Sequence, residues 1–137
     1  MNIVCGNYVV SDTKKNTMET IGQILIAIVA LEHLYFLWLE MFAWETKGKE
    51  VFKMLPANLF TPTKVLAANQ GLYNGFLAAG LTWTLFITNE QWSFYIAVFF
   101  LSCITVAGIY GTITASRKIF LIQALPAIIT LIFIHFK

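Results

Sequence analysis

The chain has 137 residues, of which 58% are hydrophobic and 12% are charged, and its mean hydropathy is +0.73. Soluble globular domains carry about 25% charged residues, so this composition excludes an ordinary soluble domain and predicts one integral membrane domain in contact with the lipid bilayer. The formal net charge of +2 is small and scattered along the chain, which excludes nucleic acid as a partner because that needs clustered Lys and Arg.

Residues 1–18 are mixed and polar, and they lack the apolar core and small-residue cleavage site of a signal peptide. We interpret them as an N-terminal extension, either a tail or an amphipathic lead-in to the first helix. Cys5 and Cys103 lie far apart, in no metal-binding or disulfide spacing. We therefore predict no metal site and no cofactor.

Residues 19–137 are predicted to form a four-helix membrane domain. Four apolar segments each have close to the ~20 residues that cross about 30 Å of hydrocarbon as a helix, and helices supply the internal backbone hydrogen bonds that a bilayer demands. The predicted fold class is all-α, an integral membrane bundle of four transmembrane helices. The spans are expected at about 19–44, 65–88, 91–114 and 119–136.

The connection at residues 45–64 mixes apolar residues with lysines and two prolines. It is expected to lie along the membrane interface as a short amphipathic helix, although a solvated loop with a few anchoring apolar residues fits the sequence nearly as well. Trp44 and Trp92 stand at span ends, as residues of the aromatic belt do.

The distribution of Lys and Arg predicts the orientation in the membrane. Loops 45–64 and 115–118 hold six of these residues, and the two termini hold three. The positive-inside rule therefore places both loops in the cytoplasm and both termini outside the cell membrane.

The first span carries Glu32, His33 and Glu40 within its apolar run. An ionisable side chain in hydrocarbon costs roughly 3 kcal/mol on insertion scales, so such residues normally face other helices or a water-filled cavity. At 100° per residue, His33, Glu40 and Trp44 fall within about 40° of one another. His33 and Glu40 are nevertheless ~10 Å apart along the axis and need an intervening side chain or water to interact.

The second span opens with Asn69, Gln70, Tyr73 and Asn74, which share an arc of about 140°. Small residues on nearly the opposite side favour close packing of another helix, and the third span carries a matching run. These two runs are Gly71, Gly75 and Ala79, and Ala107, Gly111 and Ala115.

Helix direction places the polar residues of all four spans toward the predicted cytoplasmic side. Pro126 is expected to bend the fourth helix just beyond Gln123, where a pocket could open. The amides and tyrosines could instead be interhelical hydrogen-bond glue worth roughly 0.6 kcal/mol each, but glue explains Glu40 and His33 poorly because a neutral residue joins helices at lower cost. The candidate site comprises His33, Glu40, Asn69, Gln70, Tyr73, Asn74, Tyr110 and Gln123.

Four stretches carry a resemblance to a known family: EHLYFLWLEMFAW (32–44), ANQGLYNGFLAAGL (68–81), VAGIYGTIT (106–114) and QALPAI (123–128). Over roughly residues 20–137 the chain resembles the small bacterial membrane proteins grouped as domain of unknown function 1304 (DUF1304). The resemblance implies a compact four-helix membrane protein with no established activity. It carries over, as motif positions, His33, Glu40, Trp44, Asn69, Gln70, Tyr73, Asn74, Tyr110 and Gln123.

Three functions remain open at this point. The favoured one is binding or proton-coupled transport of a small molecule, with Glu40 and His33 exchanging protons, by a homo-oligomer that we expect to be a dimer. The second is an intramembrane enzyme acting on a lipid-soluble substrate, with Glu40 as general base and Tyr73 or Tyr110 as its electrophilic partner, but no catalytic motif supports it. The third is an accessory subunit whose polar face binds a partner helix.

Overall fold

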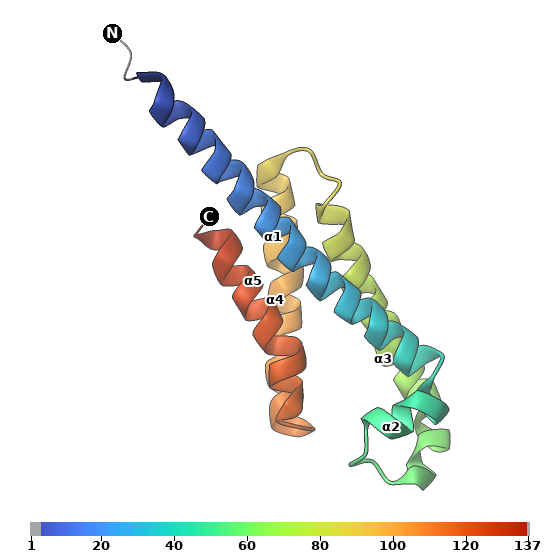
Figure 1. Cartoon of the computed structure of the whole chain (residues 1–137). Coiled ribbons are helices and arrows are strands. Elements are labelled where there is room, and N and C mark those ends of the chain that lie inside the picture. The colour runs from blue at the N-terminus through green and yellow to red at the C-terminus, as the bar shows by residue number, and fades with distance from the viewer. Residues whose placement is uncertain (1–3, 137) are drawn as a thin grey trace.

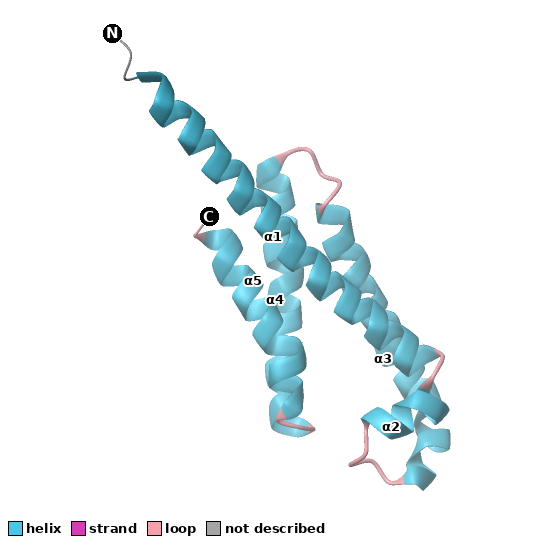
Figure 2. Ribbon diagram, viewed as in Figure 1, coloured by secondary structure: helices cyan, strands magenta, loops and turns pink. Residues whose placement is uncertain are grey.

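The protein is built from helices that run antiparallel to their neighbours in the sequence (Figures 1 and 2). A computed structural model describes the backbone of residues 4–136 and the side chains of residues 16–136. Every regular element in that range is helical, which confirms the all-α class. The four long helices are α1 (Val4–Met41), α3 (Phe60–Thr84), α4 (Glu90–Thr114) and α5 (Leu125–His135).

Helix α1 is the longest element and extends beyond the other helices at its N-terminal end (Figure 1). It begins at Val4, so the polar extension from that residue onward is helical and continuous with the apolar segment; residues 1–3 of the extension lie outside the described residues. The helix ends at Met41, and Trp44 opens the π-helical turn Trp44–Gly48 that follows.

Short helical turns connect α1 to α3. The π-helical turn is followed by α2 (Lys49–Val51) and by the 3₁₀ turn Ala57–Leu59, so the segment is not one continuous amphipathic helix. Pro56 precedes the last turn in an extended conformation, and because it has no N–H it cannot extend an α-helix through this point. The segment therefore folds back against the start of α3.

The other two connections are short. Asn89 caps α4 because its side chain accepts a hydrogen bond of 3.0 Å from the backbone N–H of Trp92, which satisfies one free donor of the first turn. The π-helical turn Phe120–Ala124 leads directly into α5. Pro126 stands at the start of α5 and lacks the N–H that a regular helix would direct at the preceding turn, so it accounts for this local widening.

The hydrophobic core lies between all four long helices. Its largest fully buried members include Leu81 of α3 and Leu101 and Ile104 of α4. Helix α4 also touches the start of the fourth helical segment almost backbone to backbone, because a Cβ on Gly108 would lie 2.8 Å from the Ala124 nitrogen. The remaining core residues are Ile26, Val29, Ala30, Ala97, Ala127 and Ile134.

The small-residue run expected on the third span only partly makes that contact. Gly111 faces Ile119, but Ala107 and Ala115 are exposed. The contact face of α4 passes through Gly108 instead, a rotation of one residue from the expected run.

Among the described residues, two helical segments are long and apolar enough to cross a membrane. They are Asn16–Met41 and Glu90–Thr114.

Candidate functional site

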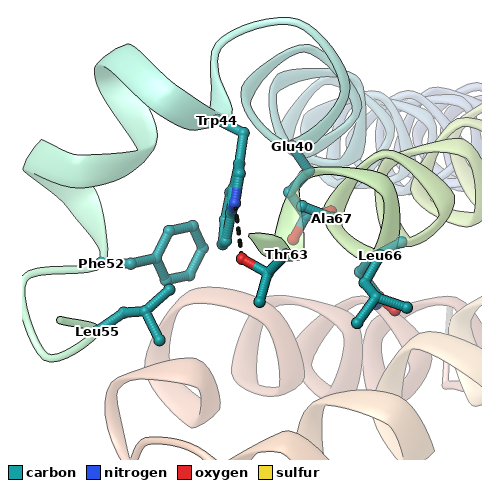
Figure 3. Close-up of a pocket in the computed structure, with 8 residues that line it drawn as sticks. Glu40, Trp44, Phe52, Leu55, Thr63, Leu66 and Ala67 are labelled. Atoms are coloured by element: carbon teal, nitrogen blue, oxygen red, sulfur yellow. Dashed lines mark hydrogen bonds between the residues drawn. The ribbon is translucent and has the colours of Figure 1, made fainter. Parts of the chain in front are cut away.

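An open pocket of about 260 Å³ lies where the end of α1, the connecting segment and the first turns of α3 meet (Figure 3). Most of its wall is apolar, and its polar groups come from Glu40, Thr63 and Gln70. The full lining is Glu40, Trp44, Phe52, Leu55, Thr63, Leu66, Ala67 and Gln70.

Trp44 forms the aromatic wall of the pocket. Its indole N–H donates a hydrogen bond of 3.2 Å to the Thr63 hydroxyl, and Figure 3 shows the ring standing between Phe52 and Thr63. The Trp44 ring centroid is 5.2 Å from that of Phe52 and 5.0 Å from that of Phe60. These contacts connect the segment after α1 to α3 and fix the tryptophan ring.

Glu40 is the acidic group of the pocket, and Asn74 holds it. The Asn74 amide Nδ2 donates a hydrogen bond of 2.7 Å to Oε2 of Glu40, and Asn74 is buried. Within the described part of the chain, Oε1 of Glu40 has no hydrogen-bond partner and no Lys or Arg pairs with the carboxylate. One carboxylate oxygen is thus held while the other is free to bind a ligand.

Gly71 allows α3 to approach α1 beside Glu40. A Cβ at this position would lie 3.1 Å from three atoms of α1, namely the Glu40 Cβ, the Leu37 carbonyl oxygen and the Met41 nitrogen. Two of these atoms belong to the backbone and cannot move aside as a side chain can. The absence of a side chain at Gly71 therefore sets the distance between Asn74 and Glu40.

The polar arc of α3 divides between two directions. Asn74 is buried. Gln70, Asn69 and Tyr73 are all exposed, but of these three only Gln70 lines the pocket. The contact face of α3 runs through Ala67, Gly71, Asn74 and Ala78, all buried. Because successive residues differ by 100°, only the Gln70 and Asn74 edge of the 140° arc meets that face.

His33 lies on the same helix as Glu40 but does not line the pocket. It is fully buried, its Nδ1–H donates to the Val29 carbonyl at 2.9 Å, and its ring meets that of Phe36 in an edge-on contact of 5.5 Å. Its Nε2 and the Oε2 of Glu32 are buried without a partner among the described residues.

The last two candidates, Tyr110 and Gln123, lie apart from the pocket. Tyr110 is exposed on α4, and Gln123 is half-buried in the π-helical turn before α5. The structure thus brings Glu40, Gln70 and Asn74 together and leaves the other candidates elsewhere. No group of three or more His, Cys, Asp or Glu side chains suited to a metal ion occurs in the described residues.

Sequence comparison decides the family. The family described as "Protein of unknown function (DUF1304)" matches residues 27–135. The chain belongs to the DUF1304 family. This confirms the resemblance noted from the sequence, and the matched range contains the whole candidate site. A similar protein, "Uncharacterized protein YpaA" of Lactococcus lactis subsp. lactis (strain IL1403), is 36% identical over 117 residues, which is 84% of this chain and 97% of the relative. No solved structure matches the chain.

Sequence reasoning missed five of the eight residues that line the pocket of this DUF1304 protein, namely Phe52, Leu55, Thr63, Leu66 and Ala67. Phe52 and Leu55 belong to the connecting segment, where no periodic pattern predicts which way a side chain points, and Thr63 is one of two threonines at the start of α3. The signal in the sequence is Trp44, which the aromatic-belt interpretation treats only as a membrane-interface residue. A buried indole N–H needs a hydrogen-bond acceptor, and the threonine hydroxyls at the start of α3 can supply one.

Proposed function

We propose that the chain is a multi-pass protein of the cell membrane whose four helical segments all cross the bilayer. Two segments have the required length and apolar character, and only 28% and 22% of their most apolar 18-residue windows are buried. The apolar helix at the centre of a soluble protein is mostly buried, because water would otherwise meet its side chains. Exposed apolar residues also cover α3 and α5, among them Phe76, Trp83, Ile129 and Ile132.

The orientation that we propose places the connecting segment and the turn after α4 in the cytoplasm and both termini outside, following the Lys and Arg distribution. Single cysteines test it in a chain in which Cys5 and Cys103 are replaced by serine. Thr88→Cys in the turn between α3 and α4 should react with a membrane-impermeant maleimide in intact cells. Met54→Cys should react only after permeabilisation, and the reverse pattern would contradict the orientation.

We propose that this membrane protein binds a small amphipathic molecule at Glu40 and transports it in exchange for protons. The observation that carries this proposal is the Glu40 carboxylate, which Asn74 holds by one oxygen at 2.7 Å while the carboxylate lines an apolar-walled pocket. A carboxylate at membrane depth is costly and is by default a functional group. His33, two turns away on the same helix, is its proposed proton-exchange partner through water.

A homodimer is the proposed working form. Asn69 and Tyr73 present polar groups on the outer surface of α3, where lipid offers no hydrogen bond and a second copy would. One copy also lacks the two repeat halves from which many transporters are built. The mass of the complex in mild detergent measures the oligomeric state.

The binding proposal is tested by native mass spectrometry of protein purified in mild detergent. A small molecule retained by the wild type should be absent from Glu40→Gln and present in Glu32→Gln, which removes a carboxylate of the same helix that does not line the pocket. Proton movement on addition of the identified molecule is then followed with a pH-sensitive dye in proteoliposomes. Unchanged retention and unchanged proton movement in both Glu40→Gln and His33→Ala would refute the proposal.

The enzyme hypothesis receives no support from the geometry. Tyr73 and Tyr110 were its electrophilic candidates, and both side chains are exposed at 62% and 69% on surfaces that do not line the pocket.

A further inference from the structure

We infer that the molecule bound at the Glu40 pocket is a lipophilic organic cation, an ammonium group that carries alkyl or aryl substituents. This inference rests on the proposed binding function and adds the chemical class of the ligand. It is carried by the charges around the pocket and by the chemistry of its walls.

The basic side chains near the pocket are already engaged with other groups. The Lys64 Nζ is 2.6 Å from Oε2 of Glu45, and Lys47 pairs with Glu50 at 2.9 Å. The Lys49 ammonium lies over the Phe60 ring, 5.9 Å from its centroid. None of them neutralises Glu40 in the part of the chain that the structure describes.

A carboxylate that has no ion-pair partner in apolar surroundings is stabilised most by a positive charge. The cation attracts the carboxylate directly and, where it carries N–H groups, also donates hydrogen bonds to it. When Glu40 is ionised, a neutral ligand leaves its charge uncompensated, and an anion is repelled because no Lys or Arg stands among the described lining residues. The ionised site therefore selects a cation.

The walls favour an organic cation over a hydrated inorganic one. Trp44 and Phe52 are aromatic, with ring centroids 5.2 Å apart, and the negative face of an aromatic ring attracts ammonium groups, Trp most strongly. Leu55, Leu66 and Ala67 offer only apolar contact. Metal ions prefer several oxygen or nitrogen ligands, whereas this wall solvates methyl groups and rings.

The Trp44–Thr63 hydrogen bond holds the aromatic wall in place in the absence of a ligand. It occupies the indole N–H at 3.2 Å, so the tryptophan offers its ring rather than a donor to the ligand. Preorganised aromatic walls lose little conformational entropy on binding. The pocket is not fully enclosed, so a longer substituent can extend out of it.

The experiment compares two probes of the same shape, benzyltrimethylammonium and neopentylbenzene, which differ by replacement of the charged nitrogen with carbon. Binding is measured by ligand-observed NMR on the full chain in detergent micelles, with protein-free micelles as the partition blank. Wild-type protein should bind the cation at least about tenfold more tightly than the neutral isostere, a difference of ~1.4 kcal/mol, because only the cation gains attraction to the carboxylate and to the aromatic faces.

Two conservative variants test the two parts of the inference. Glu40→Gln should reduce the preference for the cation to the few-fold that the aromatic walls supply, since it keeps the shape and removes the charge. Phe52→Leu should weaken cation binding about two- to fivefold and leave the isostere nearly unchanged, since it removes only the aromatic face. Glu32→Gln is the matched control and should keep the preference of the wild type.

Two outcomes overturn the inference and separate it from the proposed function. Equal binding of both probes, lost together when Leu66→Trp fills the pocket, would refute the cation and leave the binding site standing. Absence of cation binding in wild type would also refute the inference, and retention of another molecule that depends on Glu40 would then show that the pocket binds a different class. If Glu40→Gln does not give a monodisperse protein, Phe52→Leu and Leu66→Trp decide.

Discussion

Asn74 of α3 donates a hydrogen bond of 2.7 Å to Glu40 of α1, a residue 34 positions earlier in the chain. The bond joins the two helices at the edge of the pocket and leaves the second carboxylate oxygen unbound within the described residues. Stability and the proposed ligand binding consequently depend on the same pair of side chains.

Replacing Asn74 by alanine should destabilise the protein. The change removes the donor and leaves Glu40 without its partner, which costs about 1–2 kcal/mol for a hydrogen bond to a charged or buried group. Reversible unfolding in mixed micelles measures the free energy. Asn58→Ala, at an exposed asparagine of the 3₁₀ turn Ala57–Leu59, is the control and should change the free energy of unfolding by less than about 0.5 kcal/mol. Equal losses would show that the Asn74–Glu40 hydrogen bond makes no particular contribution.

Gly71→Ala should force α1 and α3 apart. Its Cβ would lie 3.1 Å from two backbone atoms of α1, whereas a Cβ at Gly75 would meet only the Leu37 side chain at 3.2 Å. We expect a loss of about 1–3 kcal/mol for Gly71→Ala and a clearly smaller loss for Gly75→Ala, since a side chain can shift. Unfolding curves of the two variants, recorded side by side, check the order, and a reversed order would contradict the described helix contact.

Binding of the cationic probe should strengthen as the pH rises, because proton and cation compete for the Glu40 carboxylate. The gain is at most tenfold per pH unit while that group titrates. Of the other charged groups at this end, Glu45 pairs with Lys64 and Lys47 pairs with Glu50. Lys49 lies over the Phe60 ring, and His33 is buried two turns away from Glu40. A pH series of binding constants should therefore slope in wild type and be flat in Glu40→Gln; the same slope in both would assign the effect to another group.

Glu45 should add a small, acid-sensitive contribution to stability. Hydrogen bonds from Lys64, and then from Thr61 at 2.9 Å, hold the pKa of the Glu45 carboxyl below its usual range. A lowered pKa in the folded state means that this contribution is present above the ordinary glutamate value, about 4.3, and is lost as the pH falls through the folded value. Glu45→Gln should flatten the acid limb of a melting-temperature series, and Glu50→Gln, whose carboxylate pairs only locally with Lys47, should leave it in place.

The helical character of the chain could be predicted because a long apolar run in a bilayer must satisfy its backbone hydrogen bonds internally, and a helix does so. Glu40 could be singled out as a candidate site residue for a related reason, since a carboxylate within such a run needs an explanation. Asn74 followed from its place in a polar arc on the next helix. These three inferences need only the sequence and the period of a helix.

The rotation of α3 about its axis could not be predicted. Asn69 and Tyr73 share the arc with Asn74, but the contact with α1 is centred on Gly71, and that choice depends on how two whole helices fit together. Because successive residues of a helix differ by 100°, a contact face that contains Asn74 leaves its neighbour Tyr73 pointing away from α1. The pattern of small residues indicated close packing without fixing its centre.

The walls supplied by Phe52 and Leu55 were beyond sequence reasoning for another reason. They lie in a segment of short turns around Pro56, where the direction of each side chain is set by the fold-back onto Trp44 and Thr63 rather than by a repeating backbone geometry. Only the three-dimensional contact shows that this segment belongs to the pocket.

The contact at Gly71 also limits how α1 and α3 can shift beside Glu40. Because α3 rests there against the backbone of α1, one helix cannot slide past the other at this level without separating from it. The part of the pocket wall formed by Phe52 and Leu55 belongs to the segment between α1 and α3, which lies outside that contact.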